Sequence, residues 1–197
     1  MTFLFDLGRV LYDFDFAPSL ARLLPAGIPD AEERIGKLLE RKDEFETGKI
    51  DVESYITWAL QVLGSDATHE EFCHAWREIF TPNEPMLKII RQLVKDGHRL
   101  IVFSNINGIH YPWIFENFPD LSLFHGAILS HETGFIKPQH EIYQYAIERY
   151  NLIPEETPYI DDLPQNIAAG RELGFPCWQY DLKNHAAFEV WLAGILK

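Results

Sequence analysis

From residue 84 onward, the chain alternates short apolar runs with segments whose apolar residues recur at helical spacing. The short runs are typical of buried strands, and the three- and four-residue spacing predicts amphipathic helices. Strands are expected at 99–103, 126–130, 157–161 and 175–180, and helices at 84–96, 141–149, 164–173 and 184–196. Strands separated by helices of this length are joined by right-handed crossovers, which predicts a parallel sheet covered on both faces.

The helix expected at 141–149 shows how the pattern assigns a buried face. The helical spacing of this segment predicts one side that contains Ile142, Tyr145, Ala146 and Arg149. We expect the apolar members of this set to pack against the sheet.

The segment 16–81 breaks this alternation. It contains no convincing strand and several helix patterns, one opened by Asp51 and another by a capping box from Thr68 to Glu71. A first strand, Phe3-Leu-Phe5, precedes it. The prediction is a doubly wound α/β fold in which a helical insert covers the carboxyl edge of the sheet.

These patterns divide the chain into two predicted parts. A catalytic core is expected to comprise residues 1–15 and 82–197, and a helical cap residues 16–81. Asp13-Phe-Asp15 falls where the chain enters the cap, so it is expected to act as a hinge or to line the mouth of a site.

Composition narrows the classes of partner. The net charge of −13 argues against nucleic acid and anionic membranes, because both need a basic surface. Cys73 and Cys177 are too few for a disulfide framework and lie in apolar patterns, which fits the cytoplasm. The first residues do not resemble a secretory signal, and no window has the length of a membrane span. A small molecule is the expected partner, and oligomeric state cannot be read from the sequence.

Reactive side chains follow four of the predicted strands. Asp6 ends the first, Ser104-Asn105 the second and Asp161-Asp162 the fourth, and Lys137 follows the third. Each alone has an ordinary explanation as a turn or helix-cap residue. Together they supply a nucleophilic carboxylate, phosphate-binding polar groups, a cation and an acid pair at one edge of a sheet, so a shared site is the stronger interpretation.

This ordered set resembles the haloacid dehalogenase-like hydrolase superfamily over nearly the whole chain. The matching segments are Phe-Asp6-Leu-Gly8-Arg-Val, Phe-Ser104-Asn105, Lys137-Pro and Ile-Asp161-Asp162-Leu-Pro-Gln-Asn166. The chain is most similar to the branch that contains the bacterial glucose-1-phosphate phosphatase and the N-terminal phosphatase domain of soluble epoxide hydrolases.

The resemblance implies roles for the matching residues. Asp6 would form an aspartyl phosphate, and it would bind Mg²⁺ together with the Gly8 carbonyl and Asp162. Asp161 would be a partner behind the metal ligands. The groups implied to hold or neutralise the phosphate are Ser104, Asn105 and Lys137.

The sequence also departs from the family pattern. Typical members carry a second Asp two residues after the nucleophile as general acid and base, whereas this chain has Gly8. Arg9 is expected either to bind phosphate or to point outward, and Asn166 stands where many relatives keep an acid. Without a proton donor, the enzyme would favour good leaving groups, such as those of hexose 1-phosphates. Candidate replacement donors are Asp13, His110 and His131.

The sequence therefore favours a Mg²⁺-dependent phosphatase of a small phosphorylated metabolite, with sugar phosphates first by resemblance. A 2-haloacid dehalogenase is a weaker alternative, because the acid pair suits a cation and dehalogenases use none. A binding or regulatory protein that has kept the fold and lost turnover is the remaining alternative, which Gly8 and Arg9 favour.

Overall fold

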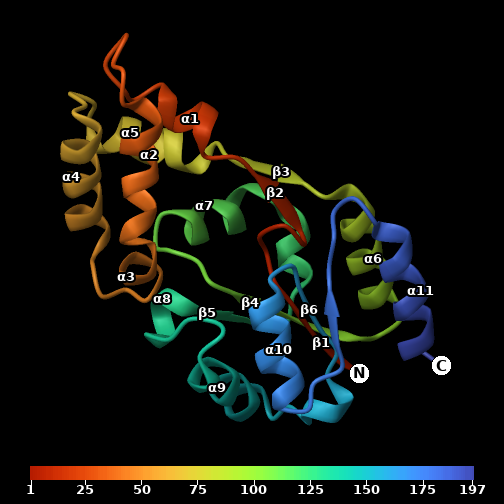
Figure 1. Cartoon of the computed structure of the whole chain (residues 1–197). Helices are drawn as coiled ribbons and strands as arrows, with labels where there is room; N and C mark the ends of the chain where they lie inside the picture. The colour runs from red at the N-terminus through yellow and green to blue at the C-terminus, as the bar shows by residue number, and fades with distance from the viewer.

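A five-stranded parallel sheet forms the centre of the larger part of the protein in the computed structural model, which describes residues 1–197 (Figure 1). The strand order is β5-β4-β1-β6-β7. The strands are β1 (Thr2–Phe5), β4 (Arg99–Ser104), β5 (Ala127–Leu129), β6 (Tyr159–Asp161) and β7 (Cys177–Gln179). The predicted doubly wound α/β fold is confirmed, with β1 at the middle of the sheet.

Helices cover both faces of this sheet. Helices α6 (Glu84–Lys95) and α11 (His185–Ile195) pack on one face, and α9 (His140–Tyr150) and α10 (Pro164–Glu172) on the other. Along β1 alternate side chains point to opposite faces, so the two phenylalanines contact the α6 side and Leu4 the α9 side. Every strand residue of β1 beyond Thr2 is buried, which explains its uninterrupted apolar sequence.

The predicted buried face of α9 is wrong in one position. Tyr145 is exposed, whereas Tyr143 is buried between the rings of Phe103 and Tyr159 and donates a hydrogen bond of 2.8 Å to the Asn166 carbonyl. Spacing alone does not distinguish two neighbouring tyrosines, because both adjoin the same apolar stripe. Tyr143 is the buried one because its ring packs on Phe103 and Tyr159 and its hydroxyl finds an acceptor on α10.

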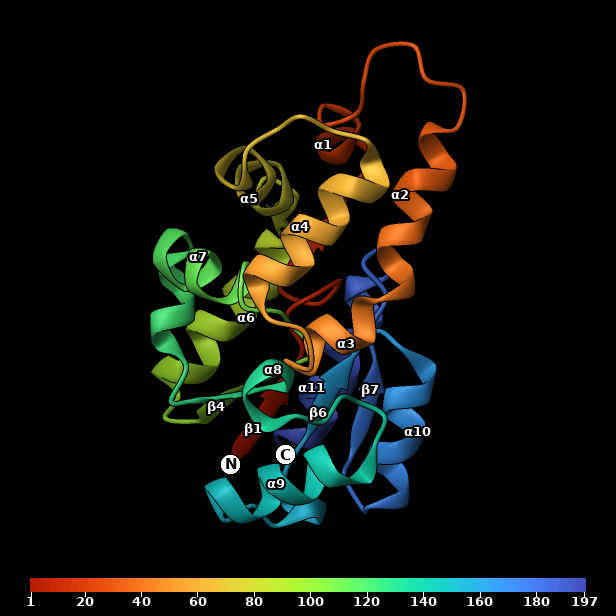
Figure 2. The same cartoon turned by 90° about the vertical axis from the view of Figure 1, so that its left-hand side faces the viewer.

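The cap segment consists of five helices around an apolar cluster of their own (Figure 2). The helices are α1 (Ala17–Ala21), α2 (Ala31–Glu40), α3 (Lys42–Glu46), α4 (Val52–Leu63) and α5 (His69–Arg77). Trp76 lies at the centre of this cluster and stacks on Phe72. The separate cluster supports the division into core and cap, which remains a prediction.

A second, two-stranded antiparallel sheet joins the two parts. β2 (Tyr12–Phe14) pairs with β3 (Phe80–Pro82), so Phe14 lies opposite Phe80. The expectation that segment 16–81 contains no strand is therefore wrong at its end, where β3 begins, because three residues form a strand here only through pairing with a distant segment. The remaining short elements are α7 (His110–Asn117), η1 (Pro119–Leu123), α8 (Ser130–Thr133) and η2 (Pro154–Glu156).

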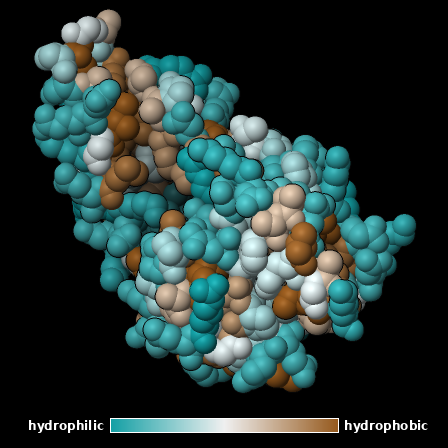
Figure 3. Space-filling view, turned by 45° about the vertical axis from the view of Figure 1, so that its right-hand side comes forward, coloured by the Kyte–Doolittle hydropathy of each residue, from teal (hydrophilic) through white to brown (hydrophobic).

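Apolar side chains gather beside a recess at the helical lobe, at the upper left of Figure 3. The rest of the face in view is mainly hydrophilic, in keeping with the acidic composition. None of the helices combines the length and apolar character needed to cross a bilayer.

Helix α4 gives a test of the cap's local stability. The Asp51 carboxylate accepts hydrogen bonds from the Ser54 amide at 2.9 Å and the Ser54 hydroxyl at 2.7 Å. Asp51→Ala should lower the free energy of unfolding by about 1 kcal/mol, because the first turn loses its cap. Urea titration would measure this loss. Asp66→Ala, which removes an exposed carboxylate outside any helix, is the control, and an equal effect of both substitutions would contradict the capping role.

Candidate active site

The carboxyl ends of β1, β4 and β6 open into one cavity of about 280 Å³ beneath the cap. Nearly all the residues singled out from the sequence meet there. Those that line it are Asp6, Gly8, Arg9, Ser104, Asn105, Lys137, Asp162 and Asn166. Asp161 is fully buried and lies behind Lys137.

The Lys137 ammonium is the hub of the site. It is buried, donates to Asp161 Oδ2 at 2.6 Å and to the Phe103 carbonyl at 2.7 Å, and lies 3.0 Å from Asp6 Oδ1. Burial alone would lower the pKa of Lys137, but Asp161 and Asp6 raise it above its ordinary range. The side chain is therefore a permanent cation beside Asp6.

The Asp161 carboxylate is fully engaged within the protein. Oδ2 accepts hydrogen bonds from Lys137 and the Tyr159 hydroxyl, both at 2.6 Å. Oδ1 accepts from the Leu163 amide at 2.9 Å and the Asn166 side chain at 3.0 Å. Burial opposes its ionisation, but Lys137 and these donors keep its pKa below the usual range. Asp161 thus fixes Lys137 and the start of α10.

The negative charges of Asp6 and Asp162 are less well compensated by neighbouring groups than that of Asp161. Burial raises the pKa of Asp6 to about 6 against the opposing effect of Lys137. Burial and the charges of Asp6 and Asp161 raise the pKa of Asp162 to about 7. Carboxylate oxygens of these three aspartates lie within 4.8 Å of one another.

The oxygen atoms at this edge fit a hard cation. The Asp162 carboxylate forms no ion pair, and the buried Oδ1 of Asn166 has no hydrogen-bond partner. Oxygen ligands of this kind are those that Mg²⁺ prefers. A divalent cation would relieve the mutual repulsion of Asp6 and Asp162 that raises their pKa values.

Ser104 and Asn105 hold the loops of the site together. The buried Ser104 hydroxyl is close enough to Asp6 to stabilise its charged form. The Asn105 side chain donates to the Lys137 carbonyl at 2.9 Å and accepts from the Lys137 amide at 2.8 Å. Asn105 therefore positions Lys137, and its predicted contact with phosphate remains a prediction.

The space beside Gly8 is occupied by an aromatic ring. A Cβ atom on Gly8 would lie 2.9 Å from the Phe14 ring. Arg9 has a left-handed backbone (φ 57°), stacks its guanidinium 4.6 Å from the Phe14 ring centre, and donates to the Phe14 carbonyl at 2.9 Å. Arg9 also pairs with Asp13. A side chain at position 8 would therefore require the Phe14 ring, which Arg9 holds, to move.

The proposed replacement proton donors are poorly placed. Asp13 is bound by Arg9, and neither Asp13 nor His131 lines the cavity. His110 does, but its Nε2 bonds the Trp76 carbonyl at 2.9 Å and its Nδ1 the Asn107 side chain at 3.1 Å. Burial lowers the pKa of His110 to about 3, so the ring is neutral and structural.

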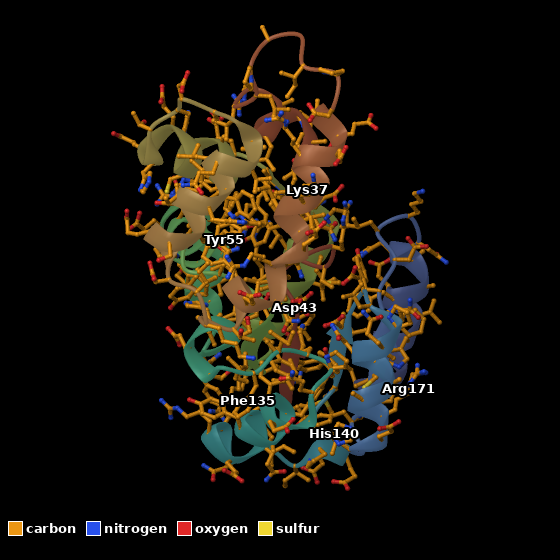
Figure 4. All side chains as sticks on the ribbon, turned by 60° about the vertical axis from the view of Figure 1, so that its left-hand side comes forward. Lys37, Asp43, Tyr55, Phe135, His140 and Arg171 are labelled. Carbon is orange, nitrogen blue, oxygen red and sulfur yellow. The ribbon has the colours of Figure 1, made fainter.

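The cap contributes residues that the sequence did not single out. Lys42 and Glu46 of α3 and Phe16 line the cavity, together with Phe14 and Phe80. Figure 4, with Asp43 labelled, shows α3 at the lower end of the cap, above the sheet. A charged pair at helical spacing is typical of a solvent-exposed face, so no sequence signal distinguished Lys42 and Glu46.

A family model described as haloacid dehalogenase-like hydrolase matches residues 1–174. The chain belongs to this family. The D-ribitol-5-phosphate phosphatase of Bacteroides thetaiotaomicron is 29% identical over 185 residues, which are 89% of each chain.

Solved structures of haloacid dehalogenase-family proteins share the fold. An enzyme of this family from Bacteroides thetaiotaomicron matches with a TM-score of 0.82 at 24% identity, over 94% of this chain and 97% of that chain. A structure of the same enzyme with magnesium and inorganic phosphate matches with a TM-score of 0.79 at 24% identity, over 92% and 94% of the two chains. A predicted hydrolase from Porphyromonas gingivalis is 26% identical, with a TM-score of 0.77 and 97% of each chain covered.

Substituting the two neighbouring aspartates of this hydrolase should have different effects on the free energy of unfolding in the absence of metal. Asp161→Ala breaks a buried ion pair with Lys137 and should cost about 3–5 kcal/mol of unfolding free energy. Asp162→Ala removes a carboxylate that burial and two like charges disfavour, so stability should stay equal or rise. Urea unfolding in EDTA at pH 8 measures both. Equal losses in the two variants would contradict this assignment of the pair.

Proposed function

We propose that the protein is a Mg²⁺-dependent phosphatase of a small phosphorylated metabolite, acting through an aspartyl phosphate on Asp6. The observation that carries the proposal is the buried Lys137 ammonium, held 3.0 Å from Asp6 by Asp161. This arrangement lets an anionic carboxylate meet an anionic phosphate, because a fixed cation offsets the charge that gathers between them.

Asp6 is the proposed nucleophile. An Asp6 carboxylate oxygen attacks phosphorus in line with the bond to the leaving oxygen, and Lys137 keeps the carboxylate charged and oriented. The Ser104 hydroxyl and Asn105 are proposed to contact phosphoryl oxygens at the end of β4. Hydrolysis of the acyl phosphate by water then restores the Asp6 carboxylate.

The proposed metal ligands are Asp6, Asp162 and the Gly8 carbonyl. Asn166, with its unpartnered Oδ1, and Asp161 lie next to this set. Mg²⁺ would neutralise phosphoryl charge as a Lewis acid. Asp161, whose oxygens all accept hydrogen bonds within the protein, is proposed to position Lys137 and not to ligate.

A sugar or polyol phosphate is the proposed substrate class. Support comes from the name of the similar D-ribitol-5-phosphate phosphatase and from a cavity of about 280 Å³, which suits a small metabolite. Lys42 and Glu46 offer polar contacts on the cap side, whereas Phe14, Phe16 and Phe80 provide an apolar wall. Arg9 lines the cavity, and its contacts with Asp13 and Phe14 support a role in holding Phe14 over a role in binding phosphate.

Asp6→Asn should abolish turnover and leave the fold intact, because it keeps the shape of the side chain and removes the attacking charge. Phosphate release from a panel of sugar and polyol phosphates, with Mg²⁺ or with EDTA, measures this. The wild type should release phosphate only with Mg²⁺. Activity of Asp6→Asn within tenfold of wild type would overturn the mechanism.

The same panel separates the alternatives. Halide release from 2-haloacids in EDTA would indicate a dehalogenase. Phosphate ester binding without turnover would indicate a binding protein.

Asp162→Asn should weaken Mg²⁺ binding far more than Asp161→Asn, because only the first is proposed as a direct ligand. Calorimetric titration of the two variants with MgCl₂ gives the comparison, with Asp66→Asn as a control distant from the site. Similar losses in both would show that the metal ligands have been misassigned.

A further inference from the structure

Three carboxyl side chains line the cavity. Asp6 and Asp162 belong to the sheet edge, and Glu46 is the only one that the cap contributes. Position 8, next to the proposed nucleophile, carries no side chain, and the Phe14 ring occupies the space beside it. The site therefore has a nucleophile and an acid pair on the sheet side, and one further carboxyl on the cap side.

The Glu46 side chain is oriented inward. The residue is 6% exposed, and its Oε2 is buried without a hydrogen-bond partner. Lys42, one helical turn earlier, forms an ion pair with this atom, with Nζ at 2.8 Å. Apart from the Lys42 ammonium, no group of the protein partners this oxygen, so it is available to a ligand in the cavity.

The turn after α3 positions Glu46 relative to the sheet. Gly48 has a left-handed backbone (φ 68°), and a Cβ there would lie 2.7 Å from the His131 carbonyl oxygen of α8. The Thr47 hydroxyl donates to the Asp43 carbonyl at 2.7 Å. Close docking of this turn on α8 brings the end of α3 over the strand ends, as Figure 2 shows.

We propose that Glu46 is the general acid and base of the reaction, supplied by the cap in place of a residue at position 8. This inference rests on the phosphatase function proposed above. In-line attack by Asp6 from the sheet edge sends the leaving oxygen away from the sheet, toward the cap. Glu46 is the carboxyl that lines the cavity on that side.

The proton balance is complete with this one residue. As the bond from Asp6 to phosphorus forms and the ester P–O bond breaks, the Glu46 carboxyl gives its proton to the leaving oxygen, which departs as an alcohol. The Glu46 carboxylate then takes a proton from water, whose oxygen attacks phosphorus. The bond to Asp6 breaks, inorganic phosphate forms, and Glu46 is again protonated.

The surroundings of Glu46 favour its protonated form. Burial raises the pKa of Glu46; Lys42 opposes this rise, and Asp43 and Asp6 add to it. The Tyr55 hydroxyl donates to the Leu38 carbonyl at 3.0 Å and is neutral, because burial raises its pKa. Among these groups only Lys42 stabilises the charged form.

The test is the dependence of rate on leaving-group basicity, measured with aryl phosphates of graded phenol pKa and with alkyl phosphates. The wild type should show a shallow slope, because a donor is present. Glu46→Gln should steepen the slope and slow alkyl phosphates by ~10²–10⁴-fold, while the best aryl leaving groups change far less. Glu46→Ala should steepen it likewise. Glu44→Gln on the same helix, an exposed glutamate paired with Arg41, is the matched control.

Dephosphorylation gives a second readout. With a good leaving group, Glu46→Gln should show a burst of phenol followed by slow turnover, since water is no longer activated. Thermal unfolding identifies which variants are folded.

The two proposals fail in different ways. A slope equal to that of Glu44→Gln in a folded Glu46 variant would overturn the role of Glu46, with the Asp6-dependent phosphatase still standing. Absence of Asp6-dependent phosphate release in the wild type would overturn both.

Discussion

One buried ammonium organises this protein. Lys137 is buried among the Asp6 and Asp161 carboxylates and the Phe103 carbonyl, which lie at the ends of three adjacent strands. A lone buried cation would be prohibitively costly, so its three acceptors have to stay at hydrogen-bonding distance. The carboxyl ends of β1, β4 and β6 are thereby held in the relative positions that chemistry at Asp6 requires.

The unequal environment of the acid pair follows from this constraint. The Asp161 carboxylate accepts hydrogen bonds from Lys137, Tyr159 and the backbone at the start of α10, so its charge is compensated within the protein. Asp162, one residue later on the exposed side of the strand end, has like charges as neighbours instead. Two adjacent and chemically identical residues thus differ: Asp161 is held by hydrogen bonds and an ion pair, and Asp162 has no cationic partner in the protein.

The cap completes the site in a way that the core does not. Phe14, stacked on Arg9, occupies the space next to Gly8, so no side chain stands there beside the proposed nucleophile Asp6. The β2–β3 pair and the docking of Gly48 on α8 tie the cap to the same sheet edge. Lys42 and Glu46 consequently reach the cavity from a helix of only five residues.

Sequence alone determined the fold class and the strand-end residues of this protein. Apolar runs and helical spacing reflect local burial, and the carboxyl ends of parallel strands necessarily share one edge, so Asp6, Ser104, Lys137 and Asp161 were predictable as neighbours. Their ordered motifs also identified the family. The burial of Tyr143 in place of Tyr145 was not predictable, because it depends on contacts with Phe103, Tyr159 and α10, which lie far away in the sequence.

Only the tertiary structure decided which cap residues line the cavity opposite the sheet edge. The faces of the cap helices that meet the core depend on contacts between segments that lie far apart in the sequence, such as Gly48 with His131 and Phe14 with Phe80. Glu46 has the sequence environment of a surface residue, in a run of charges. Its burial, and its place in the lining of the cavity that also holds Asp6, arise from packing that no local pattern encodes.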